Sequence, residues 1–206
     1  FPADLSGSIC SANLCAFRKG VKEMIECQDV SFSYPASTLP DSERQAGGAL
    51  KHISCTIEDG SFVLLCGTSG CGKTTMTRLF NGLIPHYHEG TYTGSVYLDG
   101  KDTRDLSLFD ISLKVGSVFQ NPRSQFFNVD TTSELAFGPE NHGIAEDLVR
   151  DRVKRVAAQL KLEPLLDRSI FSLSGGEKQK IACGSAAAID PDIYVLDEPS
   201  SNLDAY

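Results

Sequence analysis

A glycine-rich segment, GTSGCGKTT at residues 67–75, carries the residue types that bind a chain of phosphates. Its three glycines let the backbone turn tightly, so that several N–H groups converge on an anion at the positive end of the following helix. Lys73 can then reach the terminal phosphates, and the Thr74 hydroxyl can coordinate Mg²⁺. The segment predicts a nucleotide-binding loop; the alternative is a glycine-rich turn that matches the pattern by chance.

Polar side chains follow two short apolar runs elsewhere in the chain. Asp197 and Glu198 come directly after the apolar run at 193–196, and Gln120 comes directly after the run at 115–119. An aspartate at the tip of a buried strand can hold a water of Mg²⁺, and a neighbouring glutamate can orient or deprotonate an attacking water. A glutamine amide both donates and accepts, at the sheet edge where ligands bind in open α/β sheets. The alternative, two acidic residues that only cap a strand, explains neither the strand before them nor the turn after.

Another glycine-containing segment, LSGGEKQK at residues 173–180, has two adjacent glycines. Ser174–Gly176 precede a helix expected at 177–188, so bare N–H groups and the positive end of the helix dipole are predicted to face outward. The segment therefore predicts a second anion site. A serine N-cap followed by flexible glycines is the alternative for this segment taken alone.

Hydrophobic periodicity predicts the elements that must position these residues. A helix should follow the glycine-rich loop, because apolar side chains recur at helical spacing from Thr74 to Leu83. The segment that holds His86 and His88 should be a solvated loop, and 36–48 another loop. Strands are expected at 24–34, 50–57, 62–65, 91–98, 115–119 and 193–196.

A helical block should occupy much of the second half of the chain. Residues 131–134, Thr-Thr-Ser-Glu, have the form of a capping box and predict the start of a helix. The block should end at Pro164, before the LSGGE segment. Its apolar face is expected to comprise Leu148, Val149, Val153, Val156, Ala157 and Leu160.

Composition limits the function classes. The 206 residues carry a net charge of −8 and no block rich in Lys and Arg, which argues against a nucleic-acid partner. No apolar run approaches the roughly eighteen residues of a spanning helix, so any membrane role is expected to come through a partner. The seven cysteines form no CxxC pair, which suits buried thiols in a reducing cytosol better than zinc sites or disulfides.

The first 23 residues differ in character from the rest of the chain. They are small and polar, without sustained periodicity, and predict a poorly ordered extension or linker before a domain at 24–206. Tyr34 ends the first expected strand some thirty residues before the glycine-rich loop. It is interpreted as an adenine-stacking residue, with a plain turn aromatic as the alternative.

Together these motifs resemble the nucleotide-binding domain of ABC ATPases, over residues 24–204. The motifs that carry this resemblance are the Walker A segment at 67–74, Gln120, LSGGE at 173–177, the Walker B strand with its glutamate at 193–198, and SNLD at 201–204. A narrower resemblance is to the A component of energy-coupling factor (ECF) transporters, which import vitamins and transition-metal ions in prokaryotes. It rests on FSYP at 32–35, FNGLIPH at 80–86, VFQNPRSQFF at 118–127 and ELAFGPEN at 134–141.

The resemblance implies a fold and its extent. The expected fold class is α/β, a P-loop NTPase core with an antiparallel β subdomain and an inserted α-helical signature subdomain at about 125–185. The family places a switch histidine after the Walker B strand, and no histidine follows Asp197 before Tyr206. The domain is therefore expected to be C-terminally truncated, and this piece alone to be inactive.

The resemblance also assigns residues to ATP and Mg²⁺. Glu198 would be the general base, Gln120 would touch the metal and the attacking water, and Mg²⁺ would be held by Thr74, Gln120 and Asp197. The residues assigned to ATP are Tyr34 at the adenine, Gly67, Thr68, Ser69, Gly70, Cys71, Gly72, Lys73, Thr74 and Thr75 at the phosphates, and Ser174, Gly175 and Gly176 reaching across from a paired domain.

The implied partners are a second ABC ATPase domain, a transmembrane coupling subunit and a substrate-binding membrane subunit, at the cytoplasmic face of a prokaryotic membrane. Phe126 and Phe127 lie where the family receives a helix of the membrane partner, and core packing is the alternative for them. A soluble, translation-associated ABC protein remains an alternative function. Chromosome-maintenance ATPases are excluded, because the stretch between Lys73 and Asp197 leaves no room for their coiled coils.

Overall fold

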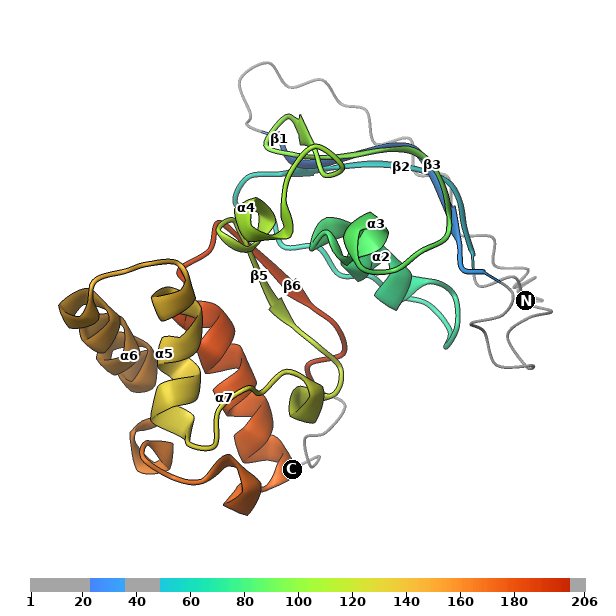
Figure 1. Cartoon of the computed structure of the whole chain (residues 1–206). Coiled ribbons are helices and arrows are strands. Elements are labelled where there is room, and N and C mark those ends of the chain that lie inside the picture. The colour runs from blue at the N-terminus through green and yellow to red at the C-terminus, as the bar shows by residue number, and fades with distance from the viewer. Residues whose placement is uncertain (1–22, 36–48, 201–206) are drawn as a thin grey trace. The chain divides into compact units, whose positions relative to one another are not determined.

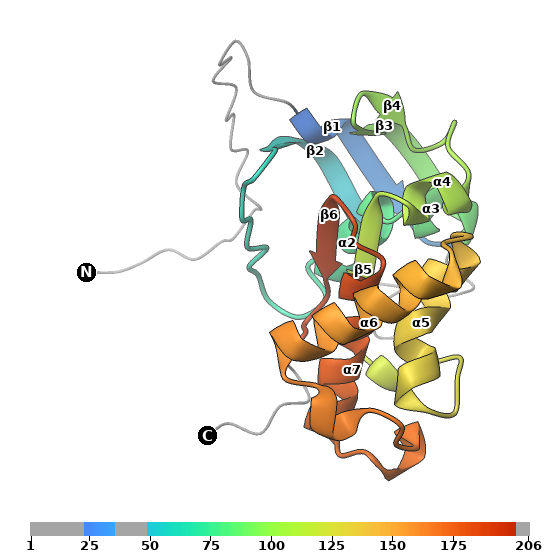
Figure 2. The ribbon, with the colours of Figure 1, turned by 90° about the vertical axis from the view of Figure 1, so that its left-hand side faces the viewer.

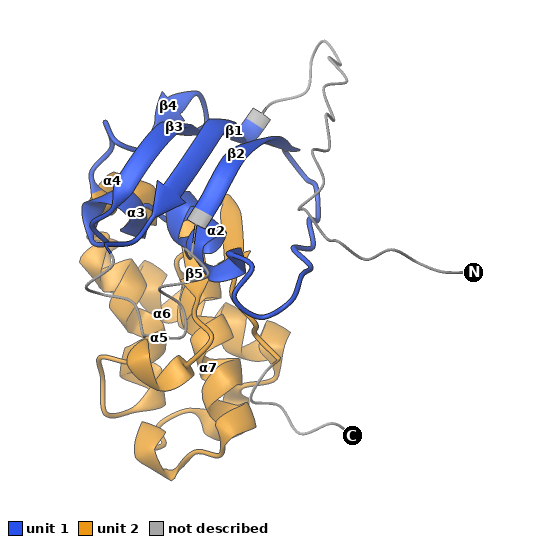
Figure 3. Ribbon diagram, turned by 90° about the vertical axis from the view of Figure 1, so that its right-hand side faces the viewer, with its two compact units in different colours: residues 1–107 blue, residues 108–206 orange. Residues whose placement is uncertain are grey.

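The computed structural model describes residues 23–35 and 49–200. These divide between two compact units, Phe1–Ser107 and Leu108–Tyr206, coloured separately in Figure 3. Residues 1–22 of the expected extension, the loop expected at 36–48 and the SNLD segment at 201–204 lie outside the described residues. Each unit contains a sheet of its own.

The first unit is built on an antiparallel sheet. Strands β1 (Glu23–Ser33), β2 (Ala49–Glu58), β3 (Thr91–Leu98) and β4 (Lys101–Asp102) are arranged in the order β2-β1-β3-β4 (Figure 2). The periodicity predicted the first three strands within one or two residues. It missed β4, which is only two residues long and pairs with β3 across a turn at Asp99–Gly100.

A β-bulge shifts the buried face of β1. The side chain of Cys27 is buried before the bulge and that of Val30 after it, so the alternation passes from odd to even positions. Asp29 absorbs the extra residue with φ of 49°. Opposite it, Gly94 has φ of 78°, and a Cβ there would collide with the backbone of Asp29. The sheet therefore needs glycine at this point of β3.

Two short helices cover one face of this sheet. Helix α2 (Lys73–Phe80) follows the glycine-rich loop and lies under the sheet in Figure 1. It buries Met76 and Leu79, as its spacing predicted. The next segment was predicted to be a loop. Residues Leu83–His86 instead form the short helix α3, in which Ile84 has non-helical angles and a buried side chain.

The strand predicted at 62–65 is wrong. Residues 61–68 are neither helix nor strand, and Phe62 and Leu64 are 91% and 73% exposed. A strand needs a neighbour to satisfy its N–H and C=O groups, and within the described residues no strand pairs with this segment. The apolar pattern alone therefore did not produce a strand.

The second unit joins a two-stranded parallel sheet to a helical block. Strands β5 (Val115–Val118) and β6 (Ile193–Leu196) pair in parallel. Only Val195 of β6 is buried, and Tyr194 and Leu196 are exposed, so the prediction of a buried strand is half right. The helices are α4 (Leu108–Ser112), α5 (Thr131–Asn141), α6 (Glu146–Leu160) and α7 (Gly175–Ala188), with 3₁₀ turns η2 (Pro122–Ser124), η3 (Glu163–Leu165) and η4 (Ile170–Ser172).

The capping box predicted at 131–134 is wrong, although the helix begins there. Asp130 is the N-cap, and its carboxylate accepts a 2.8 Å hydrogen bond from the Ser133 N–H, which lowers the pKa of Asp130. Thr131 is buried, and its hydroxyl donates to the carbonyl of Leu165 at 2.6 Å. Glu134 is turned inward rather than back to the cap, because its carboxylate binds the loop before the helix.

Helices α5, α6 and α7 pack around one apolar core (Figure 2). Leu148 and Leu160, at the edges of the face predicted for α6, are exposed. None of the helices in the described part of the chain is long and apolar enough to cross a bilayer. The α6 residues that are buried as predicted are Val149, Val153, Val156 and Ala157.

Candidate functional site

The glycine-rich loop leads into α2 through residues with left-handed backbone. Gly70 and Gly72 have φ of 77° and 99°, and Gly72 is the N-cap of α2 without a side-chain hydrogen bond. A Cβ on Gly72 would lie 2.8 Å from a methyl carbon of Leu50, so a larger residue would be both strained and crowded. The helix thus presents its first N–H groups without a side-chain cap, the arrangement that binds phosphate.

Lys73 lies over the same loop. Its ammonium donates to the carbonyl oxygens of Gly67 and Thr68, both at 3.0 Å. The side chain therefore folds back toward the start of the loop instead of extending into solvent. An anion bound at the start of α2 would meet this cation at close range.

Tyr34, the predicted adenine-stacking residue, is half-buried at the end of β1. Its hydroxyl accepts a 2.8 Å hydrogen bond from Arg78 of α2, and its ring meets that of His88 edge-on at 6.0 Å. Burial and the nearby Arg78 charge lower the pKa of His88. Sequence reasoning missed Arg78, which belongs to no recognised motif, and interpreted His88 as part of a solvated loop.

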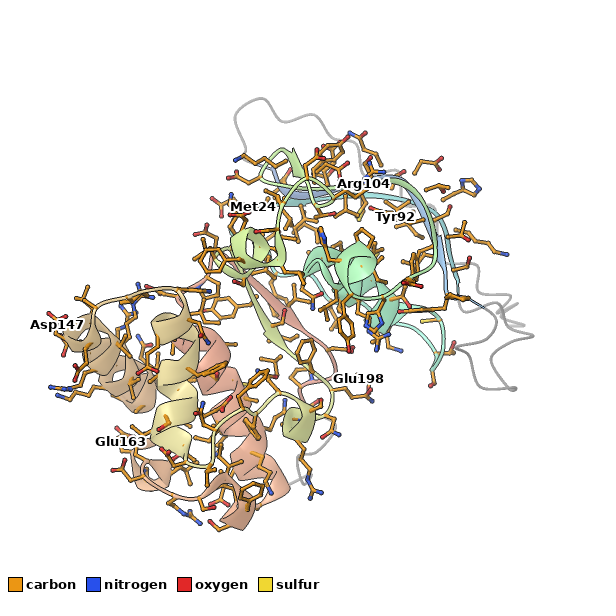
Figure 4. All side chains as sticks on the ribbon, in the orientation of Figure 1. Met24, Tyr92, Arg104, Asp147, Glu163 and Glu198 are labelled. Atoms are coloured by element: carbon orange, nitrogen blue, oxygen red, sulfur yellow. The ribbon has the colours of Figure 1, made fainter. Side chains whose placement is uncertain are left out.

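Gln120, Asp197 and Glu198 come together at one edge of the β5–β6 sheet. The Gln120 amide nitrogen donates to a Glu198 carboxylate oxygen at 2.8 Å. Glu198 is labelled in Figure 4. The Asp197 N–H donates to the carbonyl of Val118 at 2.9 Å, and its side chain is only 7% exposed. Parallel pairing of the two strands brings their carboxyl ends to the same edge, as the sequence predicted.

One backbone conformation and one side chain give this edge a fixed shape. Glu198 is exposed and has φ of 46°, a conformation that costs a non-glycine residue free energy. The Gln125 side chain ties the loop after Gln120 back to β5: its amide oxygen accepts from the Phe119 N–H at 3.1 Å, and its nitrogen donates to the Ser117 carbonyl at 3.2 Å. Sequence reasoning missed Gln125, which nevertheless lies within the VFQNPRSQFF segment.

The predicted bare N-terminus of α7 is partly closed. Ser174 is the N-cap as expected, and its hydroxyl accepts from the Glu177 N–H at 3.3 Å. The Glu177 carboxylate in turn accepts from the Ser174 N–H at 2.7 Å and from Arg168 at 3.1 Å. The hydrogen bonds from Ser174 are the main cause of the lowered pKa of Glu177. A capping box thus uses two N–H groups, while Gly175 at the start of the helix is exposed.

The predicted site residues fall into both units. Tyr34 and the loop 67–75 belong to the first, and Gln120, the 197–198 pair and Ser174–Gly176 to the second. The structure brings together Gln120 and Glu198 by a direct hydrogen bond. Their assembly with the glycine-rich loop into one site stays a prediction.

A protein-family model described as ABC transporter matches residues 50–201. The chain belongs to the ABC transporter family. This confirms the family predicted from the Walker A, LSGGE and Walker B segments. The α/β fold predicted for such an ATP-binding domain is confirmed as well.

Curated relatives are described as ABC transporter ATP-binding proteins. One from Treponema denticola is 50% identical over 88% of this ABC chain and 35% of its own length. One from Methanosarcina mazei is 44% identical over 88% of the chain and 29% of its length, and one from Pyrococcus horikoshii is 45% identical over 88% and 61%. The chain thus spans about a third of the length of the first relatives it matches.

A solved structure has a similar fold. CbiO1 from Clostridium perfringens, described as part of the ABC transporter complex CbiONQ, superposes with a TM-score of 0.71 and 27% identity. The alignment covers 89% of this chain and 68% of CbiO1. The fold of this ABC domain is therefore shared along nearly its whole length.

Proposed function

We propose that this chain is the ATP-binding part of a subunit that hydrolyses ATP to power import of a small solute through an ECF-type ABC transporter. The observation that carries the proposal is the cluster at the β5–β6 edge, where Gln120 holds Glu198 beside the buried Asp197. A carboxylate fixed next to a second, buried carboxylate suits activation of a water. The direct test is ATP-driven uptake into vesicles that contain the complete protein and its membrane subunits.

Within this proposal each residue has one task. Tyr34 stacks on the adenine, the loop 67–75 binds the phosphates with Lys73 at the terminal ones, and Glu198 takes the proton of the attacking water. Ser174–Gly176 close over the nucleotide of a second domain. The phosphates then lie between two helix N-termini, each of which contributes about 0.3–1 kcal/mol.

Mg²⁺ fits the donors assigned to it. Thr74, Gln120 and Asp197 offer a hydroxyl, an amide and a carboxylate oxygen, the hard ligands that Mg²⁺ prefers. When bound, Mg²⁺ neutralises charge on the terminal phosphates. The chain's own contribution is to hold these oxygens and to keep Glu198 oriented through Gln120.

The likeness to CbiO1 and the FSYP, FNGLIPH and ELAFGPEN segments support the ECF branch. We accordingly propose a vitamin or a transition-metal ion as the solute, a coupling subunit and a substrate-binding subunit in the membrane as partners, and the cytoplasmic face of a prokaryotic membrane as the location. We propose as well that hydrolysis requires a second ATP-binding domain to complete the site. A soluble translation-associated ATPase is the alternative function, and co-purification with ribosomes would favour it.

The two adjacent aromatic residues between Gln120 and α5, Phe126 and Phe127, differ in their burial. Phe126 packs against the apolar core of the second unit. Phe127 is 76% exposed, and its ring stacks on Phe137 of α5 at 4.9 Å and 18°. Glu134 is 1% exposed, and its carboxylate accepts from the N–H groups of Phe127 and Asn128 at 3.0 and 2.8 Å. The ring of Phe127 is exposed, and both the backbone hydrogen bond to Glu134 and the stacking on Phe137 fix its position. Such a ring is suited to anchor a partner protein.

Phe127→Asp in the complete protein is expected to leave basal ATP hydrolysis within a few-fold and to release the membrane subunit. The exposed ring can be lost without a cavity, but a charge cannot enter an apolar groove of the partner. The measurement pairs the ATPase rate with pull-down of the membrane subunit from detergent.

Leu148→Asp is the matched control, because Leu148 is also an exposed apolar residue of the same unit. It should retain both activities. Phe126→Asp should instead destabilise the fold, because it puts a charge where a partly buried ring packs against the apolar core. Retention of the membrane subunit by Phe127→Asp would remove this segment from the coupling surface.

Maleimide is expected to block ATP binding by modifying Cys71, and Mg-ATP to protect that thiol. The Cys71 sulfur lies against Gly67, since a Cβ built on Gly67 would be 2.5 Å from it. An adduct there would occupy the space above the loop that the phosphates need. Peptide mapping after timed labelling of a Cys66→Ser protein measures both effects, with Cys183 of α7 as the internal reference. Equal labelling of Cys71 with and without nucleotide would contradict its place in the cradle.

A further inference from the structure

Two cysteines lie opposite each other on neighbouring strands of the first unit's sheet. Cys27 of β1 and Cys55 of β2 are direct partners in the antiparallel register. Residues opposite each other in such a pair have Cα atoms about 4.5–5.5 Å apart, which lies within the range that a disulfide bridges. In the described part of the chain no other two cysteines occupy opposing strand positions.

The two thiols already interact. They are hydrogen-bonded to each other, and this bond is the largest cause of a raised pKa at Cys27 and a lowered pKa at Cys55. The two thiols also differ in solvent exposure, because Cys27 is 3% exposed whereas Cys55 is partly open to solvent.

This asymmetry assigns a role to each sulfur. A reagent from solvent can reach Cys55, and the hydrogen bond favours its thiolate, which is the attacking form. Cys27 is shielded from solvent yet adjacent to Cys55, so it can attack only a sulfur that Cys55 presents. The pair has the division of labour of an attacking and a resolving thiol.

We propose that Cys27 and Cys55 form a thiol–disulfide exchange site that takes small disulfides such as oxidised glutathione and closes to a cross-strand disulfide. The Cys55 thiolate attacks one sulfur of oxidised glutathione and expels one glutathione thiolate. Cys27 then gives its proton to the expelled glutathione thiolate, and its sulfur attacks that of Cys55 and expels the second glutathione as a thiolate. Two protein thiols are oxidised, and one small disulfide is reduced to two thiols.

The Cys27–Cys55 disulfide should raise the stability of the protein without changing its structure. The two strands already lie side by side, so the bond demands no rearrangement of the sheet. It constrains the unfolded chain between the two residues. Oxidation is expected to raise the Tm by about 5–15 °C, and a reductant to reverse the shift.

The test treats the full chain with oxidised glutathione and maps its peptides by mass. A Cys27–Cys55 linked peptide that has lost two hydrogens and carries no glutathione is the expected product. Glutathione retained on Cys55 would overturn the proposal. So would an unreacted pair under conditions where the exposed Cys66 is fully modified.

Serine variants separate the two roles. Cys27→Ser should trap glutathione on Cys55, because the resolving thiol is gone. Cys55→Ser should leave Cys27 unmodified, because it is shielded. Cys183→Ser, in a helix of the other unit, is the matched control and should still form the link. Modification of Cys27 in the Cys55→Ser protein would show that access, not exchange through Cys55, governs the chemistry.

Discussion

Glu198→Gln in the complete protein is expected to lower ATP turnover by roughly 10²–10⁴ while Mg-ATP still binds. The substitution removes the base but keeps a side-chain oxygen that can accept the 2.8 Å hydrogen bond from Gln120. The shape of the site therefore remains, and only proton removal from the attacking water is lost. Steady-state phosphate release and nucleotide titration measure the two quantities.

The same variant should trap two ATP-binding domains as a dimer, because ATP joins them without being consumed. Size-exclusion chromatography with and without ATP shows this directly. Asp192→Asn, an exposed carboxylate just before β6, is the matched control and should change neither rate nor elution. A rate that barely falls, with monomer only in the presence of ATP, would mean that Glu198 is not the base.

Lys73→Ala should reduce ATP affinity by at least about 100-fold, which corresponds to about 2.7 kcal/mol. The ammonium lies against the loop carbonyls of Gly67 and Thr68, where bound phosphates would meet it. Without it the phosphates keep the backbone N–H groups but lose the flexible cation of the loop. Calorimetric titration with ATP gives the affinity.

The loop should keep its fold in Lys73→Ala, because the two carbonyls released by the substitution belong to exposed residues and can bind water. A thermal melt of the variant checks this point. Lys51→Ala removes an exposed cation from β2 of the same unit and should leave the affinity unchanged. Equal affinity in Lys73→Ala and the unaltered protein would contradict the assignment of 67–75 to the phosphates.

The sequence alone determined the family, most elements and the order of the motifs. Strand 91–98 and the β6 strand were predicted with their observed bounds, because their apolar runs end at glycine-containing or acidic turns. The meeting of Gln120 with the 197–198 pair was also predictable, since parallel strands share one carboxyl edge. Such features can be predicted from the sequence alone, because they depend only on local residue patterns and on a rule about parallel strands.

Only the tertiary structure decided which predicted contacts are made. Residues 62–65 have the composition of a strand but pair with none in the described part of the chain, because pairing depends on a neighbour and not on pattern. Glu134 binds the Phe127 loop instead of capping its helix, because Asp130 already does so. Which of two adjacent phenylalanines packs against the core, and which two of seven cysteines face each other, depends on register and packing between segments distant in the sequence. A one-residue bulge in β1 is enough to shift such a register, and no local signal in the sequence announces it.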